Sequence, residues 1–394
     1  MVRGMTGNDE WAAGTGLFSV SGKITNKTPG WSFTPAAPDE QGMSYNEFEG
    51  YYPDKGGKLF SSLIKLDKKS GTSSYYRLSF SARAPERAYQ GIDFFDAGGS
   101  KLPDLYDVIY SGDKKSYDRV FYASDKVESI RIFFQSTHGC EVSDISLCSC
   151  GFEEAVEYCD RIYKTLPALD FTAPGDAFKY LPRTGSALKS GKPWKVLMLG
   201  DSIVQDTFHS QFHALIKQLY PDSAFSWQVS MRGSTGCWHY RNDGEFHSYV
   251  ADYAPDLLII GGISNYKNVT LQEGTDAIRC VAEKAMRELG CEVLLLTAAL
   301  SRDIRKENEN SKFGSEVRIP GYDDPEGLQK VSESLKTGLW DLANPCYRWL
   351  FASGKPHEFY SRDTIHSGEM GKQIIGRVML EYFKTAGVFQ QEKK

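Results

Sequence analysis

The sequence predicts an all-β sandwich followed by an α/β domain in which a parallel sheet lies between two layers of helices. Two observations predict this arrangement. Up to about residue 150, apolar residues alternate with polar ones, which is the period of half-buried strands. From Lys195 onward, short continuous apolar runs alternate with segments of helical period, which is typical of a three-layer α/β/α fold with a parallel sheet.

Length and composition are those of a globular protein with two domains. The chain has 394 residues, more than one domain of roughly 100–200 residues needs. Hydrophobic residues make up 41% of the chain and charged residues 25%, which argues against a disordered protein. The net charge is −5 and no block of Lys and Arg stands out, so we expect no nucleic-acid partner. No apolar run approaches the ~18 residues of a membrane span, so we expect no membrane partner either.

The N-terminal sequence bears on the cellular compartment. It lacks the apolar segment of roughly 7–15 residues that a signal peptide contains, which favours a cytoplasmic protein. A secreted or periplasmic protein whose leader had been removed would present the same sequence.

Residues 1–150 are predicted to form the sandwich, with a jelly-roll-like arrangement. The clearest strands cover residues 76–83 and 130–134, where every second residue is apolar, and Val142, Ile145 and Leu147 close the region. Turn-forming residues separate the apolar runs at 54–57, 97–100 and 111–113.

Residues 151–193 are predicted to be a helix and a linker. One apolar helical face extends from Phe152 to Leu166, and Pro167 ends the helix. The proline-punctuated segment that follows is expected to pack against the next domain.

Residues 194–394 are predicted to form the α/β domain. Its buried strands are expected at 196–199, 257–260 and 293–296. Its helices are expected around 208–219, 275–289, 327–350 and 370–383. In such sheets the active site lies at the carboxyl ends of the parallel strands, so we expect the catalytic residues at that edge.

The first strand of this domain ends in Gly200-Asp201-Ser202, directly before a helix. A serine there lies beside the free backbone N–H groups of a helix start, which can receive a developing oxyanion. Val204 stands where the α/β-hydrolase nucleophile elbow would need glycine, so that type of hydrolase is excluded. Serine is also a common N-cap, which is the structural alternative for Ser202.

A serine nucleophile needs a histidine base, and the base needs a carboxylate that orients it. The C-terminal part of the chain offers both in Asp363-Thr364-Ile365-His366. One short loop can present these two side chains to the same site. We therefore predict a triad of Ser202, Asp363 and His366, which needs no metal and no cofactor.

These motifs, in this order along residues 194–385, resemble the SGNH (GDSL-type) hydrolase superfamily. The resemblance implies that Ser202 is the nucleophile, His366 the base and Asp363 its orienter. It implies an oxyanion hole made by Ser202, by Gly236 within Arg232–Trp238, and by Asn265. Gly233 is the alternative to Gly236. The third block departs from the family pattern, because it reads Gly262-Ile263-Ser264-Asn265-Tyr266, with one extra residue and no following Asp.

Other polar residues allow more than one interpretation. His209 and His213 have a zinc-ligand spacing, but the zincin glutamate is missing, which favours packing. Trp238, His239 and Tyr266 are candidate substrate-binding residues, and for His239 packing within its own aromatic loop is an equal alternative. Arg362 is either a binder of an anionic sugar or an ordinary surface charge. Asp201 is expected to anchor its loop by hydrogen bonds.

The arrangement of a sandwich before this catalytic domain resembles carbohydrate esterases that carry a carbohydrate-binding-module-like domain. It implies removal of O-acetyl groups from a polysaccharide, with an acetylated carbohydrate as partner; the sequence predicts no oligomeric state. A lipase or thioesterase of the same superfamily and a non-catalytic glycan-binding protein are the alternatives. Four aromatic residues could stack on sugars, lie in the core or cover the catalytic domain: Trp31, Tyr45, Tyr51 and Tyr52.

Overall fold

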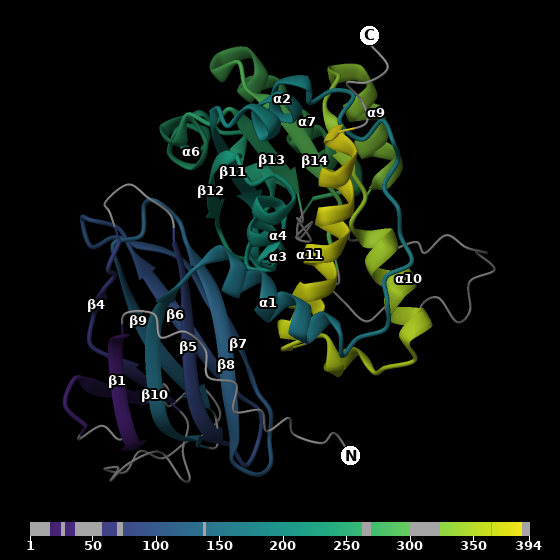
Figure 1. Cartoon of the computed structure of the whole chain (residues 1–394). Coiled ribbons are helices and arrows are strands. Elements are labelled where there is room, and N and C mark those ends of the chain that lie inside the picture. Colours follow the sequence, from purple (N-terminus) through teal and green to yellow (C-terminus); the bar gives the residue numbers. More distant parts are fainter. Residues whose placement is uncertain are drawn as a thin grey trace.

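The computed structural model describes residues 16–24, 28–35, 57–68, 74–136, 139–261, 269–299, 324–363 and 365–387. An antiparallel β-sandwich lies beside a parallel sheet that is flanked by helices (Figure 1). The fold class expected from the sequence, a sandwich followed by a three-layer α/β/α unit, is confirmed. None of the described helices is both long and apolar enough to cross a lipid bilayer.

The sandwich consists of two antiparallel sheets that enclose one apolar core. The first sheet has the order β1 (Gly16–Lys23), β10 (Glu141–Cys150), β5 (Ser74–Arg83) and β8 (Lys115–Ala123). The second has the order β2 (Trp31–Pro35), β3 (Gly57–Ser61), β9 (Ser129–Ser136), β6 (Ala88–Phe95) and β7 (Lys101–Ile109), with β4 (Ile64–Lys65) paired to β9.

The period-2 pattern of the sequence explains the core of the sandwich. In β5 the buried residues alternate with partly exposed ones, as predicted. Trp31 belongs to this core, where it is 6% exposed and lies against Phe18 and Phe134. It is therefore not free to stack on a sugar. Tyr45, Tyr51 and Tyr52 lie outside the described residues.

The second unit has a parallel sheet at its centre. The strand order is β12 (Ala224–Met231), β11 (Pro193–Gly200), β13 (Leu257–Gly261), β14 (Glu292–Leu296) and β15 (Gly338–Trp340). The helices described around it are α2 (Pro182–Ser190), α3 (Ser202–Phe208), α4 (Phe212–Leu219), α5 (Cys237–Tyr240), α6 (Asp243–Tyr249), α7 (Leu271–Leu289), α9 (Pro325–Leu335), α10 (Ala343–Ser353) and α11 (Glu369–Lys384).

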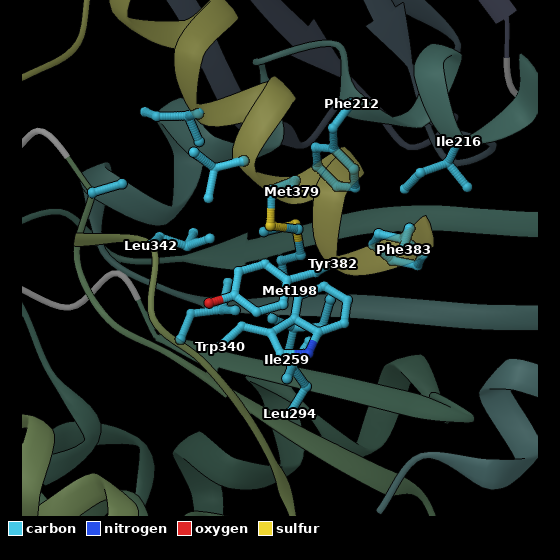
Figure 2. Close-up of a cluster of buried hydrophobic side chains, with 14 of the residues drawn as sticks. Met198, Phe212, Ile216, Ile259, Leu294, Trp340, Leu342, Met379, Tyr382 and Phe383 are labelled. Carbon is cyan, nitrogen blue, oxygen red and sulfur yellow. The ribbon is translucent and has the colours of Figure 1, made fainter. Parts of the chain in front are cut away.

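Alternate residues of each strand face opposite helical layers, which makes the unit three-layered. Met198, Ile259 and Leu294 pack with α3, α4, α10 and α11 in one core cluster (Figure 2). Leu197 and Leu258 belong to the cluster on the other face, together with residues of α5, α6, α7 and α9. Continuous apolar runs are required because both faces of the sheet are buried.

Two of the predicted helices were wrong in extent. The segment 208–219 is divided, because Gln211 adopts a left-handed conformation (φ 61°) between α3 and α4. The segment 327–350 contains the short strand β15 between α9 and α10, where Gly338, Leu339 and Trp340 extend the sheet beside β14. In both segments the apolar spacing also fits one long helix, and pairing with distant parts of the chain decides the outcome.

The segment 151–193 contributes to the cores that it connects. Helix α1 (Phe152–Tyr163) packs through Ala155 and Ile162 in a cluster that also includes Val120 of β8 and Leu215 of α4. Further along, Phe178, Leu181 and Leu188 lie in the main core of the α/β unit.

Polar contacts join the sandwich to the α/β unit along β7 and β8, and we call this contact region the seam. Asp107 of β7 pairs with Lys372 of α11 at 3.2 Å, and their side chains are 6% and 4% exposed. Arg119 of β8 pairs with Glu369 at the start of α11. On α3, the Gln205 amide donates to the Asp104 carboxylate at 3.0 Å. The sandwich is therefore anchored to the helices that flank the candidate site.

The first prediction concerns acid stability at the seam. Burial opposes ionisation of Asp107, but the charges of Lys372 and Arg119 outweigh it, so the pKa of Asp107 lies below its ordinary value of 3.8. The unfolded chain therefore binds this proton more tightly, so this contribution to stability is present above about pH 4 and is lost as the pH falls further. We expect Asp107→Asn to lower the free energy of unfolding at pH 7 by about 3–5 kcal/mol. It should also flatten the decline below pH 4, as measured by urea unfolding.

The control is Glu283→Gln, because Glu283 is 47% exposed on α7 and lies 4.0 Å from Arg279. Exposed pairs of this kind contribute about 0–1 kcal/mol, so we expect little change at either pH. An Asp107→Asn variant with wild-type stability and the wild-type acid decline would contradict the prediction.

Candidate active site

The candidate nucleophile lies at the carboxyl edge of the parallel sheet. Strand β11 ends at Gly200, and Ser202 is the first residue of α3. Asp201 caps this helix by accepting a hydrogen bond from the Ile203 N–H at 2.8 Å, which confirms it as a loop anchor. Gly200 has no room for a side chain, because a Cβ atom there would lie 2.6 Å from the carbonyl oxygen of Gly261. Glycine at this position therefore permits the close approach of β11 and β13.

The other two members of the predicted triad are within hydrogen-bonding distance of each other and of Ser202. His366 Nε2 lies 2.7 Å from Ser202 Oγ. On the other side of the ring, His366 Nδ1 lies 2.8 Å from Asp363 Oδ2 and 3.0 Å from Oδ1. The structure thus brings together three residues from the two ends of the α/β unit.

Hydrogen bonds hold the Asp363 carboxylate ionised. Burial opposes ionisation, but the hydrogen bonds from the His366 ring and from the backbone N–H groups of His366 and Ile365 outweigh it, so the pKa of Asp363 lies well below 3.8. Both N–H donors reach Oδ1 at 2.8 Å. A fixed anion beside Nδ1 favours the tautomer in which Nε2 is free to accept the serine proton.

The loop that carries Asp363 and His366 closes on itself. Ser361 and Ser367 form an isolated antiparallel bridge, and the Arg362 N–H donates to the His366 carbonyl at 2.9 Å. Arg362 itself is 1% exposed and pairs with Asp206 of α3. The interpretation of Arg362 as a surface charge or as a sugar binder was therefore wrong, because its guanidinium is buried and neutralised inside the protein.

The candidate oxyanion loop follows β12. Gly236 is buried and precedes α5, whereas Gly233 lies in an exposed turn. The Ser202 N–H belongs to the first turn of α3 and so has no acceptor within its own helix. Asn265 and Tyr266 lie outside the described residues. Two of the three predicted oxyanion donors are thus described.

Tyr240, for which the sequence predicted no role, connects this loop to β11, the strand that precedes Ser202. Its side chain is 0% exposed. The hydroxyl donates to the Gly200 carbonyl at 2.6 Å and accepts from the Arg232 N–H at 2.8 Å. The sequence Trp238-His239-Tyr240 suggested contact with a sugar and not a hydrogen bond from Tyr240 to Gly200. A tyrosine four residues after the predicted oxyanion glycine was the only sequence signal.

The remaining candidates have other surroundings. His239 is 8% exposed and lies 3.1 Å from Glu245 and 3.3 Å from Arg232, so neighbouring side chains already surround its ring. Trp238 is half-buried at the edge of the core cluster beneath α5. His209 and His213 are buried, and their rings stack on Phe94 and Tyr122, which confirms packing. Among the described residues, no three His, Cys, Asp or Glu side chains form a group that could hold a metal ion.

Chemically, the site joins a hydroxyl, an imidazole and an ionised carboxylate in series. The Ser202 proton can pass to His366 Nε2, and the imidazolium that results is stabilised by Asp363. Ser202 is partly exposed, and the side chains of His366 and Asp363 are 18% and 31% exposed. The hydroxyl can therefore be reached from solvent and can be activated for nucleophilic attack.

No protein-family model matches the sequence, and no curated protein is significantly similar to it. Several solved structures align with parts of the chain. A two-domain esterase active on acetylated mannans aligns at 13% identity over 53% of this chain and 53% of its own, with a TM-score of 0.42. The present chain thus matches about half the length of that esterase.

Two further structures each align with one part of the chain. A catalytic mutant of an acetylxylan esterase from Geobacillus stearothermophilus aligns at 13% identity over 48% of this chain and 94% of its own, with a TM-score of 0.39. The CBM22-1 xylan-binding domain of Xyn10C from Paenibacillus barcinonensis aligns at 13% identity over 35% of this chain and 97% of its own, with a TM-score of 0.23. Similarity at this level assigns no activity to the present chain.

The second prediction concerns Tyr240. Tyr240→Phe leaves the carbonyl of the buried Gly200 and the N–H of Arg232 without their hydroxyl partner, which costs about 1–3 kcal/mol of stability. We also expect faster amide hydrogen exchange across residues 232–236, measured by mass spectrometry of the native protein. The matched control is Tyr220→Phe, since the Tyr220 hydroxyl donates to the Phe383 carbonyl at 2.7 Å, away from the site. Unchanged exchange at 232–236 in Tyr240→Phe would show that the hydroxyl does not hold the loop.

Proposed function

We propose that this protein is a serine esterase of the SGNH type that removes O-acetyl groups from a polysaccharide or oligosaccharide. The observation that carries the proposal is the series of hydrogen bonds from Ser202 Oγ through His366 to Asp363, at 2.7 and 2.8 Å. A packing role for Ser202 requires neither the imidazole at its hydroxyl nor the carboxylate behind it. Acyl transfer requires both.

In the proposed reaction, Ser202 Oγ attacks the ester carbonyl while His366 Nε2 takes its proton. The tetrahedral intermediate carries an oxyanion, for which the N–H groups of Ser202 and Gly236 are the proposed donors, with Asn265 as the third. The intermediate collapses when His366 returns the proton to the departing sugar oxygen, which leaves an acetyl group on Ser202. Water then attacks the acetyl-enzyme with His366 as base, and acetate leaves.

A carbohydrate substrate is supported by the side chains beside the loop of Asp363 and His366. Arg87 and Tyr89 of the sandwich are half-buried, and both approach the Arg362 carbonyl, at 3.0 and 3.4 Å. An aromatic ring and a guanidinium are groups that bind the faces and hydroxyls of sugars. The arrangement of a sandwich before the catalytic domain, which resembles that of carbohydrate esterases, points to the same substrate class.

The third prediction is loss of esterase activity in triad variants. Ser202→Ala and His366→Ala should lower kcat for 4-nitrophenyl acetate by at least about 10³-fold, because each removes a group that acts in every turnover. Asp363→Asn should lower kcat by a similar factor, because an amide does not stabilise the imidazolium. Circular dichroism and the thermal midpoint verify that each variant is folded. Normal turnover by folded Ser202→Ala would contradict the assignment.

The fourth prediction concerns the acyl group and the polymer. We expect the wild type to release acetate from acetylated polysaccharides and oligosaccharides, with Ser202→Ala as the blank. Among nitrophenyl esters we expect acetyl to exceed chains of eight carbons or more in kcat/KM. The opposite preference would favour the lipase or thioesterase alternative. Binding of glycans without any acetate release would favour a non-catalytic glycan-binding protein.

A further inference from the structure

The loop from Ser361 to Ser367 behaves as a closed unit whose position relative to Ser202 must be fixed from outside. Its internal bridge and the hydrogen bond from the Arg362 N–H to the His366 carbonyl hold Asp363 and His366 together. Neither contact involves α3, the helix that carries the proposed nucleophile. Acyl transfer requires the imidazole to stay within hydrogen-bonding distance of the hydroxyl, so some other group must hold the loop against α3.

Asp206 supplies that constraint from the helix of the nucleophile. It follows Ser202 by four residues on α3, so the two side chains lie on the same face of the helix, one turn apart. One carboxylate oxygen of Asp206 accepts from the Arg362 guanidinium, and the other accepts from the Ser367 N–H at 2.9 Å. Asp206 therefore holds the loop at both ends, on either side of Asp363 and His366.

The sandwich also contacts Arg362, through residues of β7 and of the segment before β6. The Arg362 guanidinium carbon lies 4.3 Å from the centre of the Tyr106 ring of β7. Arg87, just before β6, donates to the Arg362 carbonyl at 3.0 Å. The guanidinium also donates to the Ser367 carbonyl at 2.9 Å. Arg362 is thus enclosed by α3, by its own loop and by the sandwich.

We propose that Asp206, Arg362 and Tyr106 form a positioning device that holds His366 in register with Ser202. Arg362 is its centre, Asp206 connects it to the nucleophile helix, and Tyr106 makes the sandwich part of it. The inference rests on the proposed esterase function. It goes beyond that function because it makes the sandwich necessary for turnover of any ester, including one with no sugar to bind. A sandwich that only binds glycan would affect polymer substrates alone.

The test compares kcat and KM for 4-nitrophenyl acetate in the full-length protein. Asp206→Asn should lower kcat by about 10–100-fold with KM within about threefold, because a displaced base slows chemistry more than binding. Tyr106→Leu should lower kcat in the same manner by about tenfold. Tyr106→Phe keeps the ring over Arg362, so its kcat should lie within about twofold of wild type. If the Tyr106 hydroxyl were the important group, Tyr106→Phe would lose activity as Tyr106→Leu does.

The matched control is Asp118→Asn. Asp118 of β8 also accepts from arginines near the seam, Arg77 and Arg161, but no described hydrogen bond links it to the loop of residues 361–367. We expect its thermal midpoint to fall by less than in Asp206→Asn, because Asp118 is 23% exposed, while its kcat stays within about twofold of wild type. This comparison separates positioning from general loss of stability.

The outcomes separate the two proposals. Folded Asp206→Asn or Tyr106→Leu with wild-type kcat, or Asp118→Asn with an equal loss of kcat, would overturn the positioning device and leave the esterase assignment intact. Should Asp206→Asn fail to fold, Tyr106→Leu alone decides, since Tyr106 is half-buried and carries no charge. Absence of Ser202-dependent hydrolysis in the wild type would overturn the esterase proposal, and this inference with it.

Discussion

The arrangement of the site depends on burying one arginine. A guanidinium that is 1% exposed has lost its water, and it is stable there only if a carboxylate and further acceptors surround it. Asp206 and the Ser367 carbonyl both accept hydrogen bonds from its Nη1, and the Tyr106 ring lies over the guanidinium. Burial alone would lower the pKa of Arg362, but the charge of Asp206 outweighs it and keeps the group protonated. Because Arg362 cannot release its charge, the elements that carry its partners must all stay close to it.

The same requirement explains the charge of the seam. Asp107, Arg119, Glu369 and Lys372 are paired across it, and Tyr158 of α1 also donates to Glu369. Such pairs contribute little net stability compared with apolar packing. They nevertheless require a fixed geometry, because a shifted partner leaves a buried charge uncompensated. The pairs therefore fix where α11 begins relative to β7 and β8. The loop of Asp363 and His366 directly precedes that helix start.

Local patterns were sufficient to predict the fold class and the strands β5, β9, β10, β11, β13 and β14. Alternation in β5 and the apolar runs of β11, β13 and β14 each reflect the two faces of a sheet, so the residues themselves show which face is buried. The divided helix at Gln211 and the strand β15 could not be predicted in this way. Their apolar spacing fits a helix equally well, and only contacts with distant segments distinguish the two outcomes.

Within the candidate site, the hydrogen-bonded series of Ser202, His366 and Asp363 was predictable because each part is a short motif beside an element boundary. Ser202 follows a strand, and Asp363 and His366 lie three residues apart in one loop. The supporting residues were harder to recognise. Tyr240 and Asp206 act through hydrogen bonds to segments 8 to 161 residues away in sequence.

The sandwich is packed against the α/β unit more closely than an appended binding module would be. An appended binding module is expected to share a small, wet contact with its neighbour and to move relative to it. Here β7 and β8 contact α11 through the ion pairs Asp107–Lys372 and Arg119–Glu369, and β7 contacts α3 through the hydrogen bond from Gln205 to Asp104. The Tyr122 ring of β8 stacks on His213 of α4 with ring centres 4.4 Å apart. Separating the two units would expose to water the Asp107–Lys372 pair and the stacked rings of Tyr122 and His213. The sandwich and the α/β unit therefore share buried polar contacts, and the candidate catalytic loop contacts both through Arg362.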